Sequence, residues 1–162
     1  MIGRARRGRG LIAATFLVAL LLTVLPMPDW ALPYRPPWVA LTLIYWTLAL
    51  PERVGVFSAF AVGILLDVLS VSLLGQHALS LSVVAYLALE LHQRIRQFPV
   101  LQQTMSVWML LLVERLLFLW VLGATGQPVP GFLYWGGSVT GALLWPWLFV
   151  LLRNLRRRFW SG

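Results

Sequence analysis

Long apolar segments alternate with short polar breaks along the whole chain. Bilayer-spanning helices need about 17 to 25 predominantly apolar residues, and four of the apolar segments reach that length, whereas 37–50 and 78–92 are shorter. The pattern predicts an all-α polytopic membrane protein, with one integral-membrane domain over 1–162 and a bundle of six transmembrane helices. The predicted helices cover residues 11–27, 37–50, 54–74, 78–92, 101–123 and 132–152.

The breaks between these segments carry residues that end helices. Prolines crowd the first gap, and Pro51, Glu52 and Arg53 form the second. Gly75, Gln76 and His77 form a short polar turn. The first apolar segment follows a basic stretch, as a signal peptide would, but it has no convincing small-x-small cleavage site. We therefore predict an uncleaved first helix.

Composition excludes a soluble domain. Hydrophobic residues make up 60% of the chain, and the 13 basic and 5 acidic residues are too few for a water-exposed surface. The absence of cysteine excludes disulfides, thiolate metal sites and cysteine nucleophiles. The net charge of +8 does not indicate nucleic-acid binding, because the arginines flank apolar segments and form no face of a soluble module.

The arginines predict the orientation. Six helices put both termini on one side of the membrane, and eleven arginines fall on that side, whereas the opposite side carries only Arg35. Because positive charge is enriched in cytoplasmic loops, both termini should be cytoplasmic. The eleven are Arg4, Arg6, Arg7, Arg9, Arg53, Arg94, Arg96, Arg153, Arg156, Arg157 and Arg158.

A small-residue stripe runs along the third segment. Gly55, Ala59, Gly63 and Asp67 recur at steps of four, which places them on one slowly rotating helix face. Small residues at this spacing let a second helix approach closely. The stripe is a candidate either for packing within the chain or for docking a partner's helix. Gly137 and Gly141 form a second such pair in the sixth segment, ahead of Pro146, which should kink that helix.

Asp67 ends the first stripe among apolar neighbours. A carboxylate that faces lipid near the bilayer centre costs on the order of 3 kcal/mol, so Asp67 should face protein or water. The fifth segment holds Glu114 and Arg115 in an apolar run, and at about 1.5 Å per residue Asp67 and Arg115 both lie roughly 10 to 12 Å from the outer helix ends. We predict that Asp67 meets Arg115 in the bundle interior. Alternatively, Arg115 pairs on its own helix or with Glu114 of another chain.

No enzyme signature is present in the sequence. His77 and His92 lack the spacing of metal ligands, and no phosphate-cradling glycine loop or nucleophile arrangement occurs. We therefore expect no cofactor and no catalytic residues.

The final arginine cluster should anchor the chain at the cytoplasmic face. A more specific hypothesis is that the cluster also contacts anionic lipid or an acidic partner.

Three stretches of the chain resemble the MreD family of rod shape-determining membrane proteins, in its proteobacterial form. They cover 35–55, 60–87 and 144–159, in the family's order, and they include the Gly63-x-x-x-Asp67 element followed by Leu74 and Gly75. The stretches read RPPWVALTLIYWTLALPERVG, FAVGILLDVLSVSLLGQHALSLSVVAYL and LWPWLFVLLRNLRRRF. One departure is the Glu114-Arg115 pair, where family members can carry a single acid.

The resemblance implies a non-enzymatic scaffold in the bacterial inner membrane, part of the cell-elongation machinery. It implies contact with the single-span protein MreC and, directly or through it, with MreB and the elongation-specific transpeptidase and glycosyltransferase that build lateral peptidoglycan. Related families share a six-helix bundle with the substrate-binding subunits of vitamin transporters. The alternative function is therefore the binding or transport of a small ligand or lipid precursor, with Asp67, Glu114 or Arg115 as the polar contact. The environment of Asp67 discriminates the two functions, because a sealed ion pair favours the scaffold and an open polar cavity favours ligand binding.

Overall fold

The described part of the chain is entirely helical. A computed structural model describes residues 2–24, 37–50, 54–69, 75–97, 99–126 and 136–160, and these ranges hold six α-helices. The prediction of an all-α fold with six helices is confirmed over these residues. The helices are α1 (Ile2–Val24), α2 (Trp38–Ala49), α3 (Val56–Leu69), α4 (Gln76–Gln97), α5 (Val100–Ala124) and α6 (Gly136–Trp160).

Helices α1, α4 and α6 extend beyond the apolar segments that predicted them. Helix α1 begins at Ile2 and so includes the basic stretch before the first segment, and α4 and α6 continue through their arginine-rich ends. Arginine is a good helix former, so a helix can continue after its apolar face ends. Helix α6 also continues through Pro146. The predicted ends at 25–27 and 70–74 and the predicted start at 132–135 lie outside the described residues.

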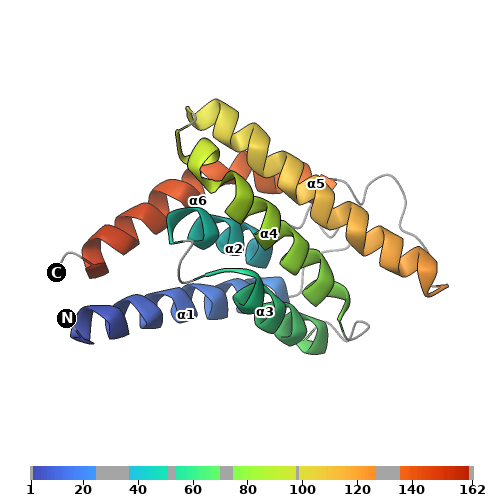
Figure 1. Ribbon diagram of the computed structural model, residues 1–162, viewed down its shortest axis with the longest axis horizontal. Helices are drawn as coiled ribbons and strands as arrows, with labels where there is room; N and C mark the ends of the chain where they lie inside the picture. Colours follow the sequence, from blue (N-terminus) through green and yellow to red (C-terminus); the bar gives the residue numbers. More distant parts are fainter. Residues whose placement is uncertain are drawn as a thin grey trace.

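The short helix α2 forms the centre of the bundle. Every residue from Val39 to Leu48 is buried, and α2 packs against α1, α4 and α6, which surround it in Figure 1. A helix that is apolar on all sides is typical of such a buried position. Residues 37–50 look like an ordinary membrane span because they are apolar with weak periodicity. The structure gives a second cause for this pattern, since neighbouring helices cover the segment on all sides.

Aromatic side chains fill the core around α2. The ring of Tyr45 packs edge-on against Trp46 and against Phe149 of α6, with centroid distances of 5.1 and 5.7 Å. The indole N–H groups of two buried tryptophans link helices through hydrogen bonds. Trp46 of α2 donates to Thr15 of α1 over 2.8 Å, and Trp145 of α6 donates to Gln103 of α5 over 3.2 Å.

The outer surface of the bundle is apolar. Phe57, Leu101 and Trp147 expose 92%, 75% and 76% of their surface, and they come from three different helices. Exposed apolar surface of this extent indicates contact with a membrane or a partner. Among the described helices, α5 and α6 contain stretches long and apolar enough to cross a membrane, and α1, α2 and α3 contain shorter apolar ones. The start of α1 and the end of α6 lie at the same end of the molecule (Figure 1).

Candidate functional site

The Asp67 carboxylate is bound to the first turn of the next helix. Asp67 lies near the end of α3 and is 1% exposed. Its Oδ2 accepts a hydrogen bond from the backbone N–H of Gly75 over 2.9 Å and from that of Ala78 over 3.4 Å. Its Oδ1 accepts from the backbone N–H of His77 over 2.8 Å. The buried carboxylate therefore has backbone partners on both oxygens.

This arrangement is an N-cap supplied from another helix. The carbonyl of Gly75 accepts the first bond of α4, from Leu79 N–H over 2.8 Å, so Gly75 occupies the N-cap position. Glycine has no side chain that could accept the free N–H groups of the first turn, and Gly75 takes a φ of +98°, which favours glycine. Asp67 reaches those N–H groups from α3, and its negative charge also suits the positive end of the α4 dipole.

Gly63 allows the close approach that this cap requires. A Cβ added at Gly63 would overlap the Cα of Ala78 and would lie 2.6 Å from the Ala78 nitrogen and 2.9 Å from the His77 carbonyl carbon. These are backbone atoms, so no side-chain rotation can relieve the overlap. Gly63 lies one helical turn before Asp67 on the same face. The Gly63-x-x-x-Asp67 element therefore seats the start of α4 against α3 and then caps it.

The rest of the stripe also faces α4. Ala59 is completely buried, and a Cβ at Gly55 would make an ordinary contact of 3.5 Å with Leu89 of α4. Gly55, Gly63 and Asp67 thus contact the α4 side of the interface, and Ala59 is buried on the same face of the helix. This is packing within the chain, and it leaves little of the stripe accessible to a second protein.

His77 joins the cap to α5. Its Nδ1 lies 2.7 Å from Oδ1 of Asp67, and its ring lies over Phe118 of α5 with centroids 4.8 Å apart. Glu114 precedes Phe118 by four residues, is buried, and lies within electrostatic range of His77 and Arg115. The cap of α4 and the charged residues of α5 therefore belong to one buried polar cluster.

Arg115 approaches Glu114 on its own helix. The distance from Arg115 Nε to Glu114 Oε2 is 3.9 Å, which corresponds to a loose ion pair and matches the first alternative weighed for Arg115. The direct meeting of Asp67 with Arg115 remains a prediction. Asp67 does not depend on Arg115 for hydrogen bonds, because the start of α4 already supplies them.

The glycine pair of α6 lies in a second close-packed region. Gly137 and Gly141 are both buried. A Cβ at Gly141 would lie 2.9 Å from Cδ of Pro37, just before α2, and 3.0 Å from Cδ1 of Leu111 in α5. Gly141 thus allows α6 to approach both α2 and α5. Among the described residues, no three His, Asp or Glu side chains gather as metal ligands would.

Comparison with known proteins supplies the family. The model of the family described as rod shape-determining protein MreD matches residues 5–155. The chain belongs to the MreD family. A curated relative, the rod shape-determining protein MreD of Haemophilus influenzae, is 32% identical over 150 residues, which are 91% of each chain. No solved structure matches the chain.

One member of the buried cluster, His77, is not predicted from this MreD-family sequence. The sequence predicts the turn at Gly75, Gln76 and His77, but it assigns no role to His77, which lacks the spacing of metal ligands. Its pairing with Asp67 across ten positions follows no local helix rule. The only sequence signal was the proximity of a lone intramembrane acid to a polar turn that begins the next helix.

Proposed function

We propose that this chain is a non-enzymatic, multi-pass component of the bacterial inner membrane that maintains rod shape by scaffolding lateral peptidoglycan synthesis. It acts through contact with MreC, and directly or through MreC it joins MreB and the elongation-specific transpeptidase and glycosyltransferase. The observation that carries the proposal is the match of the rod shape-determining family model to residues 5–155. The curated relative, also named a rod shape-determining protein, supports it over nearly the whole chain.

The proposed topology has six spans with both termini in the cytoplasm. Two independent observations support it. The eleven arginines on one predicted side follow the positive-inside tendency. In addition, α1 begins and α6 ends at the same end of the bundle (Figure 1), as an even number of crossings requires.

The environment of Asp67 favours a scaffold over a ligand site at this residue. Intramembrane acids are functional-site candidates by default, and an open polar cavity around Asp67 would have supported ligand binding there. Instead, Asp67 is 1% exposed and its oxygens accept backbone hydrogen bonds from α4. A carboxylate sealed in this way fixes the position of one helix against another.

The MreC span should contact the outer surface of the bundle, because the small-residue stripe is used inside the chain. A photo-reactive residue placed in turn at Phe57, Leu101 and Trp147, on α3, α5 and α6, samples three exposed faces. Ala59, which is completely buried, is the matched control on α3. The variants are expressed in rod-shaped cells that lack their own copy of the protein, and the captured partner is identified.

We expect rescue of rod shape and capture of MreC from at least one exposed face, with no capture from Ala59. Scanning the neighbouring exposed positions of the responding helix then defines the contact face. The scaffold proposal fails if the variants restore rod shape and yet no exposed position on any helix captures MreC. It also fails if deletion of the chain leaves cells rod-shaped.

A further inference from the structure

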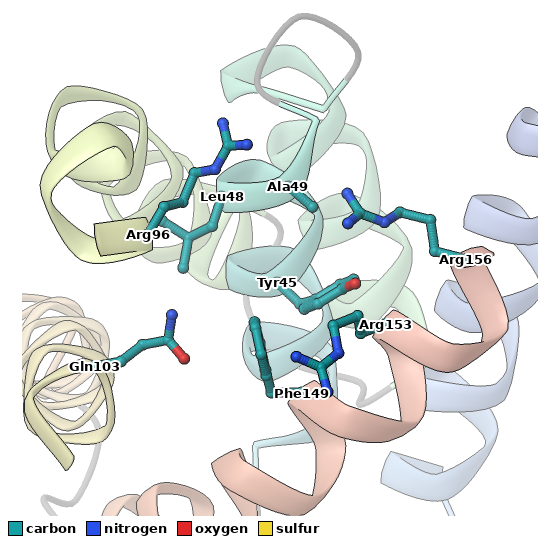
Figure 2. A pocket seen from close by; sticks show the side chains of 8 residues that line it. All are labelled: Tyr45, Leu48, Ala49, Arg96, Gln103, Phe149, Arg153 and Arg156. Atoms are coloured by element: carbon teal, nitrogen blue, oxygen red, sulfur yellow. The ribbon is translucent and has the colours of Figure 1, made fainter. Parts of the chain in front are cut away.

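A cavity of about 120 Å³ lies between α2, α4, α5 and α6, and none of its lining residues belongs to the Asp67 cluster. A single water needs only about 10 to 15 Å³ of such space, so the cavity can hold a group of several heavy atoms. Figure 2 shows its lining from these four helices. The lining residues are Tyr45, Leu48, Ala49, Arg96, Gln103, Phe149, Arg153 and Arg156.

The cavity carries positive charge from two helices. Arg96 comes from the last turn of α4, and Arg153 and Arg156 come from the C-terminal part of α6. None of the eight residues that line the cavity is acidic. Arg153 and Arg156 are half-buried, so their charges are less screened than those of the more exposed Arg157 and Arg158 that follow. This concentration of positive charge favours the binding of an anion.

Tyr45 gives the cavity a fixed hydrogen-bond donor. Its ring is held by Trp46 and Phe149, and its side chain lies beside those of Arg153 and Arg156 in Figure 2. Only 2% of Tyr45 is exposed, and its hydroxyl has no hydrogen-bond partner among the described residues. A buried hydroxyl without a partner is costly, so this phenol is positioned for a ligand that accepts a hydrogen bond.

Arg153 is held in a similar way. Its guanidinium carbon lies 5.5 Å from the centre of the Phe149 ring, which orients the side chain. Its Nε is buried and likewise has no partner among the described residues. Gln103, on the opposite wall, is already engaged, because it accepts from the Trp145 indole and donates to the Ile95 carbonyl. The available donors therefore come from the arginines and Tyr45.

We propose that this cavity binds a phosphate group, held by Arg153, Arg156 and the Tyr45 hydroxyl, with Arg96 at its rim. Guanidinium groups match phosphate oxygens in geometry and charge, and the three donors come from two helices whose relative position is fixed by the aromatic core. The inference is independent of the proposed contact with MreC.

The headgroup of an anionic membrane lipid is the source that we favour. The cavity lies among the arginine-bearing helix ends, where the positive-inside count predicts the cytoplasmic face, and basic pockets between helices on that face bind lipid phosphates. A free phosphate presents the same chemistry. An acidic peptide is a different occupant, which the small volume and the buried position of the Tyr45 hydroxyl disfavour.

The test uses the full chain in nanodiscs of phosphatidylcholine. Phosphatidylglycerol is titrated in as the lipid probe, inorganic phosphate as the soluble probe, and a polyglutamate peptide as the acidic competitor. Bound molecules are counted by native mass spectrometry. The variants are Arg153→Gln, Arg156→Gln and Tyr45→Phe. The matched control is Arg158→Gln, which removes the same charge from an exposed position of α6 outside the cavity.

We expect saturable retention of phosphatidylglycerol, about tenfold weaker in Arg153→Gln and Arg156→Gln, since one charge-assisted hydrogen bond is worth about that factor. Tyr45→Phe keeps the ring packing and should weaken retention several-fold, with retention by Arg158→Gln unchanged.

Loss of inorganic phosphate binding in the same variants would support the site with a soluble source of phosphate. Equal weakening by Arg153→Gln and Arg158→Gln, or binding of polyglutamate alone, would overturn the proposal. Variants that lose helical circular dichroism are replaced by Arg153→Lys, which keeps the charge but loses the two-pronged geometry and should weaken retention.

Discussion

The Nδ1 atom of His77 lies 2.7 Å from Oδ1 of Asp67, at the point where α4 begins. The same carboxylate oxygen accepts the backbone N–H of His77 over 2.8 Å, so one residue of α4 binds one acid of α3 through both its main chain and its side chain. The His77 ring then lies on Phe118 of α5. Three helices are thereby linked through the side chains of Asp67, His77 and Phe118.

Replacing Asp67 with Asn should destabilise the protein by about 1 to 3 kcal/mol, because hydrogen bonds to a charged acceptor are worth about that much. The Asn side chain keeps one acceptor oxygen but loses the charge at the α4 N-terminus. The free energy of unfolding in mixed detergent micelles measures the effect. Glu90→Gln is the control, since it removes one negative charge from an exposed position of α4. Equal losses in the two variants would contradict the capping role.

Gly63→Ala should be far more damaging than Gly55→Ala. The new methyl group at Gly63 would meet the backbone of Ala78, whereas at Gly55 it would only touch the end of the Leu89 side chain at 3.5 Å. Overpacking typically costs about 1 to 3 kcal/mol, so we expect a loss in that range for Gly63→Ala and little change for Gly55→Ala.

Gly141→Ala should fall between them, because its nearest atoms belong to the side chains of Pro37 and Leu111. Thermal unfolding in detergent, followed by circular dichroism, gives the ranking. A Gly63→Ala variant as stable as the wild type would show that α3 and α4 do not approach as closely as described.

Gly75→Ala should destabilise the protein through backbone strain alone. Nothing lies within 4 Å of a Cβ added there, but the φ of +98° disfavours any L side chain. Left-handed conformations cost roughly 1 to 2 kcal/mol for residues other than glycine. Gly123→Ala is the matched control, because its Cβ also meets open space without a positive φ. The prediction fails if the two variants unfold at the same temperature.

Thr15→Val should loosen α1 from the bundle. The substitution keeps the size of the side chain but removes the hydroxyl oxygen that accepts the indole N–H of the completely buried Trp46 over 2.8 Å. A buried donor left without a partner costs about 1 to 3 kcal/mol. The unfolding free energy and the protease sensitivity of α1 report the change, and Thr104→Val on the exposed side of α5 is the control.

The predicted meeting of Asp67 with Arg115 has a functional test. Each charge reversal, Asp67→Arg and Arg115→Asp, should abolish support of rod shape. If the two side chains depend on each other, the double reversal should restore it. Because Asp67 also caps α4, we expect the restoration to be partial. Complete failure to restore would assign Asp67 to the cap alone and Arg115 to Glu114.

The helices were predictable from the sequence, whereas the polar contacts between them were not. Apolar runs and proline-rich breaks predict that these six helices exist and in which order, because those features act locally, but α1 begins nine residues before its predicted start and α6 ends eight residues after its predicted end. The partners of Asp67 could not be read in this way, since a cap normally comes from the residue that begins the helix. Here that residue is Gly75, and the acceptor comes from a different helix.

The arginine-lined cavity, too, could not be predicted from the sequence. The cluster at the end of the chain predicts a basic surface, and it predicts nothing about Tyr45, which lies in an apolar segment more than a hundred residues away. Tyr45 reaches Arg153 only because α2 occupies the centre of the bundle and its ring packs on Phe149 of α6. That position depends on how the helices pack, which periodicity does not encode.

The inter-helix cap has a consequence for how the protein enters the membrane. In the proposed six-span topology, α3 on its own would carry an unsatisfied carboxylate into the bilayer, at a cost on the order of 3 kcal/mol, and the first turn of α4 would carry backbone N–H groups without acceptors. The carboxylate of α3 and the first-turn N–H groups of α4 satisfy each other only when both helices are present. At Gly63 the two helices are in direct contact, with no room for another group between them. We therefore expect the two helices to leave the insertion machinery together as one hairpin. If α3 were synthesised separately from α4, its carboxylate would remain without partners.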